Sequence, residues 1–262
     1  MVEHVPGEIL PAPLDTELAE QRLDALADRY RKAGNIGIQL LNAIGGQAES
    51  LLASLPAPVR DRLGDTTESA LRLAMDTAHR SRDLVAEQPG WLTRAITTTM
   101  GAAGGMGGLP SALAELPVTT TVLLRAIQDV AVEHGFDPAE AAIRYDCIEI
   151  FASAGPLEHD DGADLAFLST RMTVTGPALQ RLIASVSPRL AAVLGQKLAA
   201  QTVPVLGAAA GAATNYAYTR YYQQMAEVHF GLRRLAIDAD IPHEALLAAF
   251  RARVAPPGVT RG

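Results

Sequence analysis

Two uncharged stretches of the chain decide the fold class. Residues 95–114 read AITTTMGAAGGMGGLPSALA, and residues 198–219 read LAAQTVPVLGAAAGAATNYAYT. Each is as long as a helix that spans a bilayer, about 20 residues. However, Gly, Ala, Thr and Pro gain too little from transfer into lipid to make a stable span. We therefore predict that both stretches are mainly helical segments packed against other helices.

Small residues recur four positions apart in both stretches, at Gly104 and Gly108 and at Gly207 and Gly211. Missing side chains let two helix backbones approach closely, in water as well as in membranes. The spacing favours a tight helix–helix contact in the core over a hairpin that leans on or inserts into a membrane. Because glycine costs about 1 kcal/mol in a helix interior, the run from Gly104 to Gly108 could also be a loop.

The composition favours an all-α fold. Apolar residues make up 48% of the 262 residues, but aromatic residues make up only 5%. The core must therefore be aliphatic, which suits packed helices better than sheets. We predict a single helical, bundle-like domain over residues 14–254, with the two Gly/Ala-rich segments as its central pair. A flexible arm is expected over residues 1–13 and a flexible tail over residues 255–262.

Capping and breaking residues predict where some helices begin and end. Asp15 or Thr16 can cap the first helix, which is expected to lead into a glycine-dotted stretch that begins at Gly34. Ser187-Pro188 is expected to begin a later helix, because proline suits the first helical turn.

Charge and cysteine content limit the possible functions. The formal net charge of -7 argues against nucleic-acid binding, which needs a concentrated basic surface. Cys147 is the single cysteine, so an internal disulfide is impossible and a reducing cytoplasm is expected. We expect a cytoplasmic protein that is peripheral to the inner membrane if it binds one. No histidine spacing suits a metal and no cofactor motif is present, so neither is expected.

Polar residues form stripes on the helices that follow both uncharged stretches. The helix expected after Pro117 carries Thr121, Arg125 and Asp129 four positions apart, with Glu115 as an additional carboxylate near its start. A long helix is expected over residues 216–236. It and the turn before it carry a second stripe at steps of three and four positions, formed by Asn215, Tyr218, Tyr222, Met225 or Ala226, His229 and Arg233.

The stripes have two interpretations. In an active site, Glu115, Asp129 or His229 would act as the acid or base. The ligand would then be bound by Thr121, Arg125, Asn215, Tyr218, Tyr222 and Arg233. The same residues could instead form a buried polar network that fixes how the helices align, and we favour this second interpretation.

The residues around the stripes resemble the EcsC family of bacterial proteins. The matching blocks are GGLP at 107–110, ELPVTTT at 115–121 with Leu124-Arg125, VPVLGAAAGAATNY at 203–216, and MAEVHFGLRRL at 225–235. The resemblance extends from about Arg22 to Leu235. After Leu235 the chain has Ala236-Ile237 where the family usually has a Tyr-Gly pair. The resemblance implies a helical fold and a link with membranes or exporters, because the family is named for a gene beside an ABC-type exporter. It assigns no catalytic residue.

Three functions remain open from the sequence. The leading hypothesis is a non-enzymatic module that associates with a membrane surface, a lipid or a membrane-protein partner such as an exporter. The first alternative is a hydrolase that acts on an apolar or lipid-like substrate. The second is an oligomeric scaffold in which the glycine faces form the interface between copies of the chain.

Overall fold

A computed structural model describes residues 12–43, 53, 55–84, 117–152, 168, 176–201 and 207–255. These ranges are mostly helical and contain no strand, which confirms the all-α fold. The uncharged segment at 95–114, with Gly104 and Gly108, lies outside the described residues, as does Glu115. The limits proposed for the domain, its arm and its tail stay predictions.

The helix α7 (Gly207–Asp238) lies at the centre of the described structure. Its first third carries the uncharged residues 207–219, with Gly207 and Gly211 in its first two turns. The long helix expected over residues 216–236 is therefore part of a longer one. The helices that pack against α7 are α1 (Thr16–Ala43), α5 (Ala141–Ala152), α6 (Gly176–Gln201) and α8 (His243–Val254).

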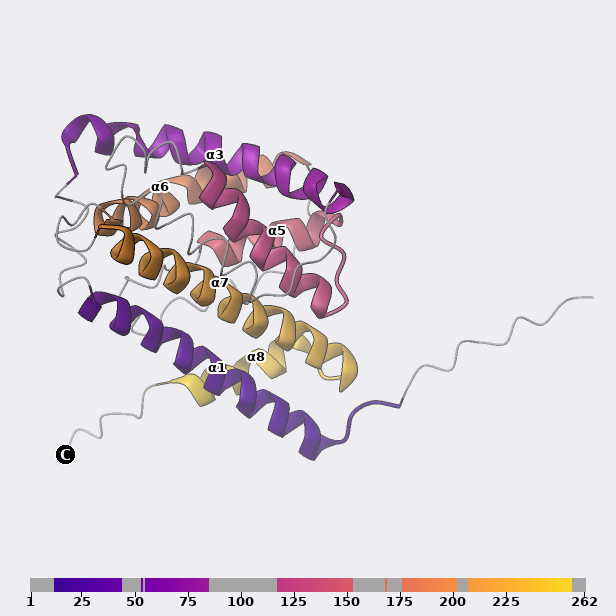
Figure 1. Ribbon diagram of the computed structural model, residues 1–262. Coiled ribbons are helices and arrows are strands. Elements are labelled where there is room, and N and C mark those ends of the chain that lie inside the picture. Colours follow the sequence, from indigo (N-terminus) through magenta and orange to yellow (C-terminus); the bar gives the residue numbers. More distant parts are fainter. Residues whose placement is uncertain are drawn as a thin grey trace, which may run out of the picture.

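The remaining helices extend this packing into layers (Figure 1). α1 packs along one side of α7, and α6 packs against α7 from another side. α3 (Ala57–Leu84) packs against α6. A further helix occupies residues 117–133 and leads through a short turn into α5. The helices α5, α6 and α7 thus lie between α1 and α3.

α1 begins at a side-chain cap and buries one face. The backbone N–H of Leu18 donates to Oδ1 of Asp15 over 2.7 Å, which confirms the expected cap and satisfies an N–H that the helix itself leaves open. Ala19, Leu23 and Ala27 follow at steps of four positions, and all three are buried. α1 then continues through Gly34 to Ala43, so the described part of the expected glycine-dotted stretch belongs to the helix.

The expectation that Ser187-Pro188 begins a helix is wrong. Pro188 lies inside α6, which begins at Gly176. Proline removes one helical hydrogen bond and normally bends or breaks the helix. Here Pro188 is exposed, so its ring does not disturb the packed side of α6. The hydroxyl of Ser187 donates to the carbonyl of Ile183 over 2.6 Å, so this buried polar group is satisfied within the helix.

The corner between helix 117–133 and α5 is a Schellman motif. The N–H of Phe136 donates to the carbonyl of Ala131 over 2.9 Å, and the N–H of Gly135 donates to Val132 over 2.8 Å. Gly135 has φ +78°, the left-handed conformation that this motif requires and that glycine adopts without a steric penalty. Asp137 then accepts from the N–H of Ala139 over 2.8 Å, so the chain turns directly toward α5.

The corner between α7 and α8 repeats the same motif with a different residue. The N–H of Ile241 donates to the carbonyl of Ala236 over 3.1 Å, and the N–H of Asp240 donates to Ile237 over 3.3 Å. The position that Gly135 occupies in the first corner is taken here by Asp240, with φ +51°. A residue with a Cβ is less stable than glycine in this conformation, because the Cβ comes close to a backbone carbonyl oxygen.

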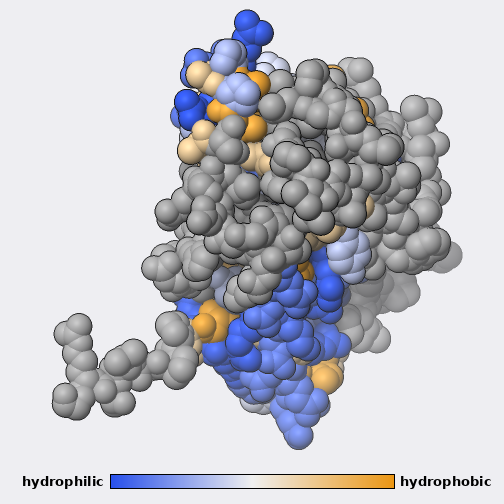
Figure 2. Space-filling model, turned by 60° about the vertical axis from the view of Figure 1, so that its left-hand side comes forward, coloured by the Kyte–Doolittle hydropathy of each residue, from blue (hydrophilic) through white to orange (hydrophobic). Residues whose placement is uncertain are grey.

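None of the helices in the described ranges is long and apolar enough to cross a membrane. Figure 2 shows one face of the molecule, and hydrophilic residues gather at its lower end, at the level of α1 in Figure 1. The exposed side of α1 carries charged pairs of both signs, such as Arg31 with Asp28. This side of the molecule is therefore suited to water.

Candidate functional site

Asp146 of α5 receives two basic side chains from α7. Asp146 is only 4% exposed. Nη1 of Arg233 donates to its Oδ2, and Nε2 of His229 lies 3.4 Å from the same oxygen. His229 and Arg233 are four positions apart, so they project from one face of α7. We call Asp146, His229 and Arg233 the buried charge cluster.

Aromatic rings cover the buried charge cluster. The guanidinium of Arg233 lies 5.0 Å from the ring centroid of Phe136, at the distance of a cation–π contact. The ring of Phe136 lies 5.7 Å from that of Phe230, which lies 5.0 Å from the imidazole of His229. The corner at Gly135 therefore matters for this site, because it places Phe136 over Arg233.

A second ionic group joins three elements on another side of α7. Oε2 of Glu227 lies 3.2 Å from Nε2 of His134 and 3.6 Å from Nη1 of Arg29 of α1. Burial, the largest effect, raises the pKa of Glu227. The hydrogen bond from His134 and the charges of Arg29 and His134 outweigh burial, so the net effect lowers this pKa. The carboxylate is thus held in its charged form.

The stripe on helix 117–133 is largely buried. Nε of Arg125 lies 4.0 Å from Oδ2 of Asp129, and their side chains are 15% and 8% exposed. The hydroxyl of Thr121 donates to the carbonyl of Pro117 over 2.8 Å. Arg125 and Asp129 therefore pair within the helix, and Thr121 is bonded to its own backbone.

The amino-terminal part of the α7 stripe belongs to the core. Asn215, Tyr218 and Tyr222 are all buried. The hydroxyl of Tyr218 donates to the carbonyl of Val193 in α6 over 3.2 Å. The ring of Tyr222 meets that of Phe151 in α5, with centroids 5.0 Å apart and an edge-to-face angle of 71°. These tyrosines hold α7 against α6 and α5.

The geometry favours a structural role for these polar residues. A general acid or base must come within hydrogen-bond reach of its substrate. The side chain of His229 is only 3% exposed and faces Asp146, while Asp129 is 6% exposed. Within the described ranges, no group of three histidine, cysteine or carboxylate side chains is arranged to hold a metal. The roles suggested for the stripe residues as catalytic or ligand-binding groups stay predictions.

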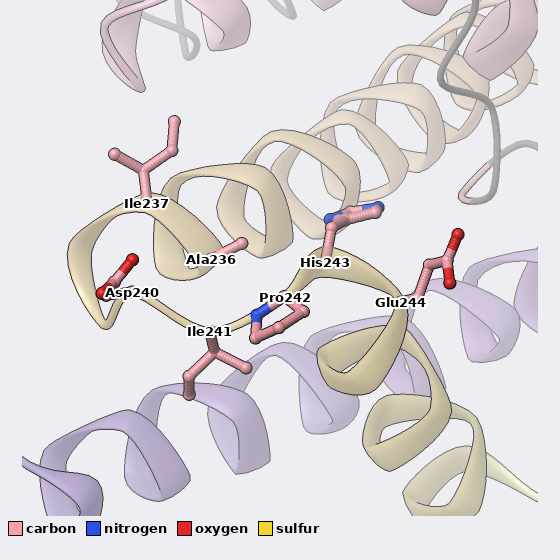
Figure 3. A pocket seen from close by; sticks show the side chains of 7 residues that line it. All are labelled: Ala236, Ile237, Asp240, Ile241, Pro242, His243 and Glu244. Carbon is pink, nitrogen blue, oxygen red and sulfur yellow. The ribbon is translucent and has the colours of Figure 1, made fainter.

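The sequence stripes did not include Asp146, Phe136 or His134. Asp146 lies in α5 (AAIRYDCIEIFA), which also carries Arg144 and Glu149, so the sequence did not distinguish it as the buried carboxylate. Its partners could not be identified, because the position of α5 against α7 depends on the corner at Gly135. Figure 3 shows a further feature that the sequence did not indicate, a surface hollow at the α7–α8 corner.

Comparison of the sequence with known proteins identifies its family. Residues 39–235 match the EcsC protein family. The chain belongs to the EcsC family. A relative in Bacillus subtilis (strain 168), "Uncharacterized protein YdbA", is 26% identical over 127 residues. The matched part covers 48% of this EcsC chain and 44% of that relative, so it spans less than half of the relative's length. No solved structure matches the chain.

Proposed function

We propose that this EcsC-family chain is a non-enzymatic helical module that associates with a membrane through its uncharged segment 95–114 and the exposed residues of segment 198–219, such as Ala213 and Tyr216 of α7. The observation that carries the non-enzymatic part is the burial of the two described acid–base candidates. His229 is paired with Asp146 across a helix interface, and Asp129 lies within ion-pair distance of Arg125. Groups used in this way align helices and are not available to a substrate.

The membrane part of the proposal is supported by the distribution of charge along the chain. Each uncharged segment has about 20 residues without an acidic or basic group, which removes the largest cost of contact with lipid. The exposed face of α1 carries many charges instead, so it is poorly suited to lipid. Contact through the uncharged segments is therefore the arrangement that leaves the charged face in water.

Flotation with vesicles tests the proposal. The full chain is mixed with vesicles of phosphatidylethanolamine and phosphatidylglycerol and centrifuged through a density gradient. We expect the chain to float, and we expect Ala102→Glu or Ala213→Glu to reduce the floating fraction severalfold, because each places a charge in an uncharged segment and Ala213 is exposed. Ala184→Glu is the matched control, since this alanine is exposed on α6 outside both segments.

Circular dichroism on all three variants establishes whether each remains folded. A wild-type chain that stays at the bottom of the gradient and carries no lipid in native mass spectrometry would overturn the proposal. Equal flotation of the wild type, both segment variants and the control would also overturn it, because the uncharged segments would then have no part in binding. The hydrolase alternative requires Glu115, Asp129 or His229 to reach a substrate, and the scaffold alternative requires self-association without vesicles.

A further inference from the structure

The α7–α8 corner forms an open hollow with an apolar side and an acidic rim. Its volume is about 370 Å³, and it is lined by residues 236–237 and 240–244. In Figure 3, Ile237 and Asp240 stand at one end of the hollow and Glu244 at the other, with Pro242 and His243 between them. Ile237 is 60% exposed, the highest value among the large exposed apolar side chains of the described ranges.

The far wall of the hollow is held in place by His243. This side chain is 8% exposed, and its Nε2 lies 3.1 Å from the carbonyl oxygen of Leu168. A carbonyl oxygen can only accept, so Nε2 carries the proton and donates. The first residue of α8 is thus fixed to a distant part of the chain. The hollow is therefore a formed feature of the surface, with little need for ordering when a ligand binds.

Asp240 gives the hollow a carboxylate at a position where the fold would favour glycine. The first corner has Gly135 at the equivalent position, with φ +78°. At φ +51°, an aspartate makes the folded chain less stable than a glycine at the same position would. Positions where a sequence departs from the locally favoured residue are often functional. The departure here adds a negative charge beside Ile237.

Both rim carboxylates are without an ionic partner in the described part of the chain. The nearby Asp238 pairs with Arg22 over 3.2 Å and with Arg234 over 2.8 Å. No such pair joins Asp240 or Glu244 to a described residue, and both are exposed. An exposed isoleucine beside one unpaired carboxylate, with a second carboxylate across the hollow, is complementary to a ligand with an apolar stem and a positive end.

We propose that the hollow at the α7–α8 corner binds a lysine or arginine side chain of a partner peptide, with the aliphatic stem against Ile237 and Pro242 and the charged end facing the acidic rim formed by Asp240 and Glu244. This inference deepens the proposed function, because the inner flanks of membrane proteins are rich in Lys and Arg. A membrane-associated module would meet such segments where it docks. The overall charge of -7 favours the same class of partner.

A titration followed by two-dimensional ¹H–¹⁵N NMR on the full chain tests the proposal. The probe is the peptide acetyl-Ala-Leu-Lys-Leu-Ala-amide. The first control peptide has norleucine in place of lysine, which keeps most of the stem and removes the charge. The second has glutamate. We expect the lysine peptide to shift the amide signals of residues 236–244, and we expect the glutamate peptide to leave them unchanged. The norleucine peptide should bind several times more weakly.

Variants at the rim separate binding from stability. Asp240→Asn and Glu244→Gln should each weaken binding of the lysine peptide about threefold, and the double variant about tenfold. Asp240→Gly should weaken binding equally while raising the melting temperature, because glycine relieves the left-handed backbone. Asp28→Asn on α1 is the control, an exposed carboxylate in an ion pair distant in sequence from the hollow. It should leave binding unchanged.

Several results would overturn the proposal. One is a lysine peptide that shifts no signals, or shifts only signals outside residues 236–244. Another is equal binding of the lysine and glutamate peptides, or binding that the double rim variant does not weaken. A concentration-dependent shift of the same signals without peptide would assign the hollow to a second copy of the chain. Vesicle flotation is measured without the peptide. Its failure would refute the proposed membrane association and would not change the interpretation of the peptide titration.

Discussion

The imidazole of His229 and the carboxylate of Asp146 face each other across the interface of α7 and α5, with Nε2 3.4 Å from Oδ2. Arg233 reaches the same oxygen from the next turn of α7. The pair lies in the packed interior and links two helices that are more than 80 positions apart in the sequence. A buried carboxylate with two basic partners allows only one alignment of these helices without leaving a charge unpaired.

We expect Asp146→Ala to lower the free energy of unfolding by about 2 kcal/mol. Loss of one partner of a buried pair costs about 3–5 kcal/mol, and the value is smaller here because the side chain of Arg233 is 30% exposed and can turn to water. Urea unfolding measures the change. Asp28→Ala removes an exposed pair with Arg31 and should cost less than about 0.5 kcal/mol. Equal losses in both variants would contradict a special role for the buried charge cluster.

Gly135→Ala should destabilise the chain by about 1 kcal/mol, and Gly135→Asn by less. Among the described residues, a Cβ at Gly135 would meet only Nη1 of Arg234, at an ordinary distance of 3.6 Å. The cost therefore comes from the left-handed backbone at φ +78°, which alanine tolerates less well than asparagine. Thermal unfolding should show a fall of about 2–3 °C for alanine. An alanine variant as stable as the wild type would refute this explanation of the corner.

Glu227 should make stability depend on pH in the acid range. Its pKa is lowered in the folded state, so its contribution is present above its ordinary pKa of 4.5 and is lost as the pH falls through the folded value. We expect the unfolding free energy of the wild type to exceed that of Glu227→Gln near pH 7. The difference should shrink as the pH falls below 4.5. A difference that stays constant down to about pH 3 would exclude this linkage.

The crossing of α1 and α7 should be sensitive to side-chain size at Gly231. A Cβ there would lie 2.7 Å from Cδ2 of Leu26. We expect Gly231→Val to cost about 2–3 kcal/mol, because a larger side chain must displace Leu26 and with it α1. Leu26→Ala in the same chain should recover part of this loss, giving a coupling of at least about 0.5 kcal/mol in a double-mutant cycle. Strictly additive effects would show that the two residues do not compete for space.

The fold class was predictable because it depends on composition and periodicity. The Asp15 cap could also be predicted, since a cap is a local interaction between neighbours in sequence. The continuity of α1 through Gly34 and of α6 through Pro188 could not. In both cases packing of the whole helix outweighs a local preference of about 1–3 kcal/mol. Local signals therefore located helices more reliably than they located helix ends.

The candidate site was predictable only in part. His229 and Arg233 were singled out because their spacing places them on one helix face. Their partner Asp146 depends on how α5 packs against α7, and no local signal encodes that arrangement. Asp240 is a similar case, since an aspartate after a helix is common and only its backbone angle of φ +51° distinguishes it.

The contact between α1 and the last two helices has a consequence for how the chain is made. The N–H of Leu14 donates to the carbonyl of Asp238 over 2.9 Å, and Arg253 of α8 reaches Asp24 over 2.6 Å. During translation α1 leaves the ribosome some two hundred residues before the surfaces that cover it. The apolar residues Ala19, Leu23 and Ala27 of α1 have no partner surface until α7 and α8 have been synthesised. Until then they must stay exposed to water or be covered by another protein. Although α1 is made first, it therefore docks last.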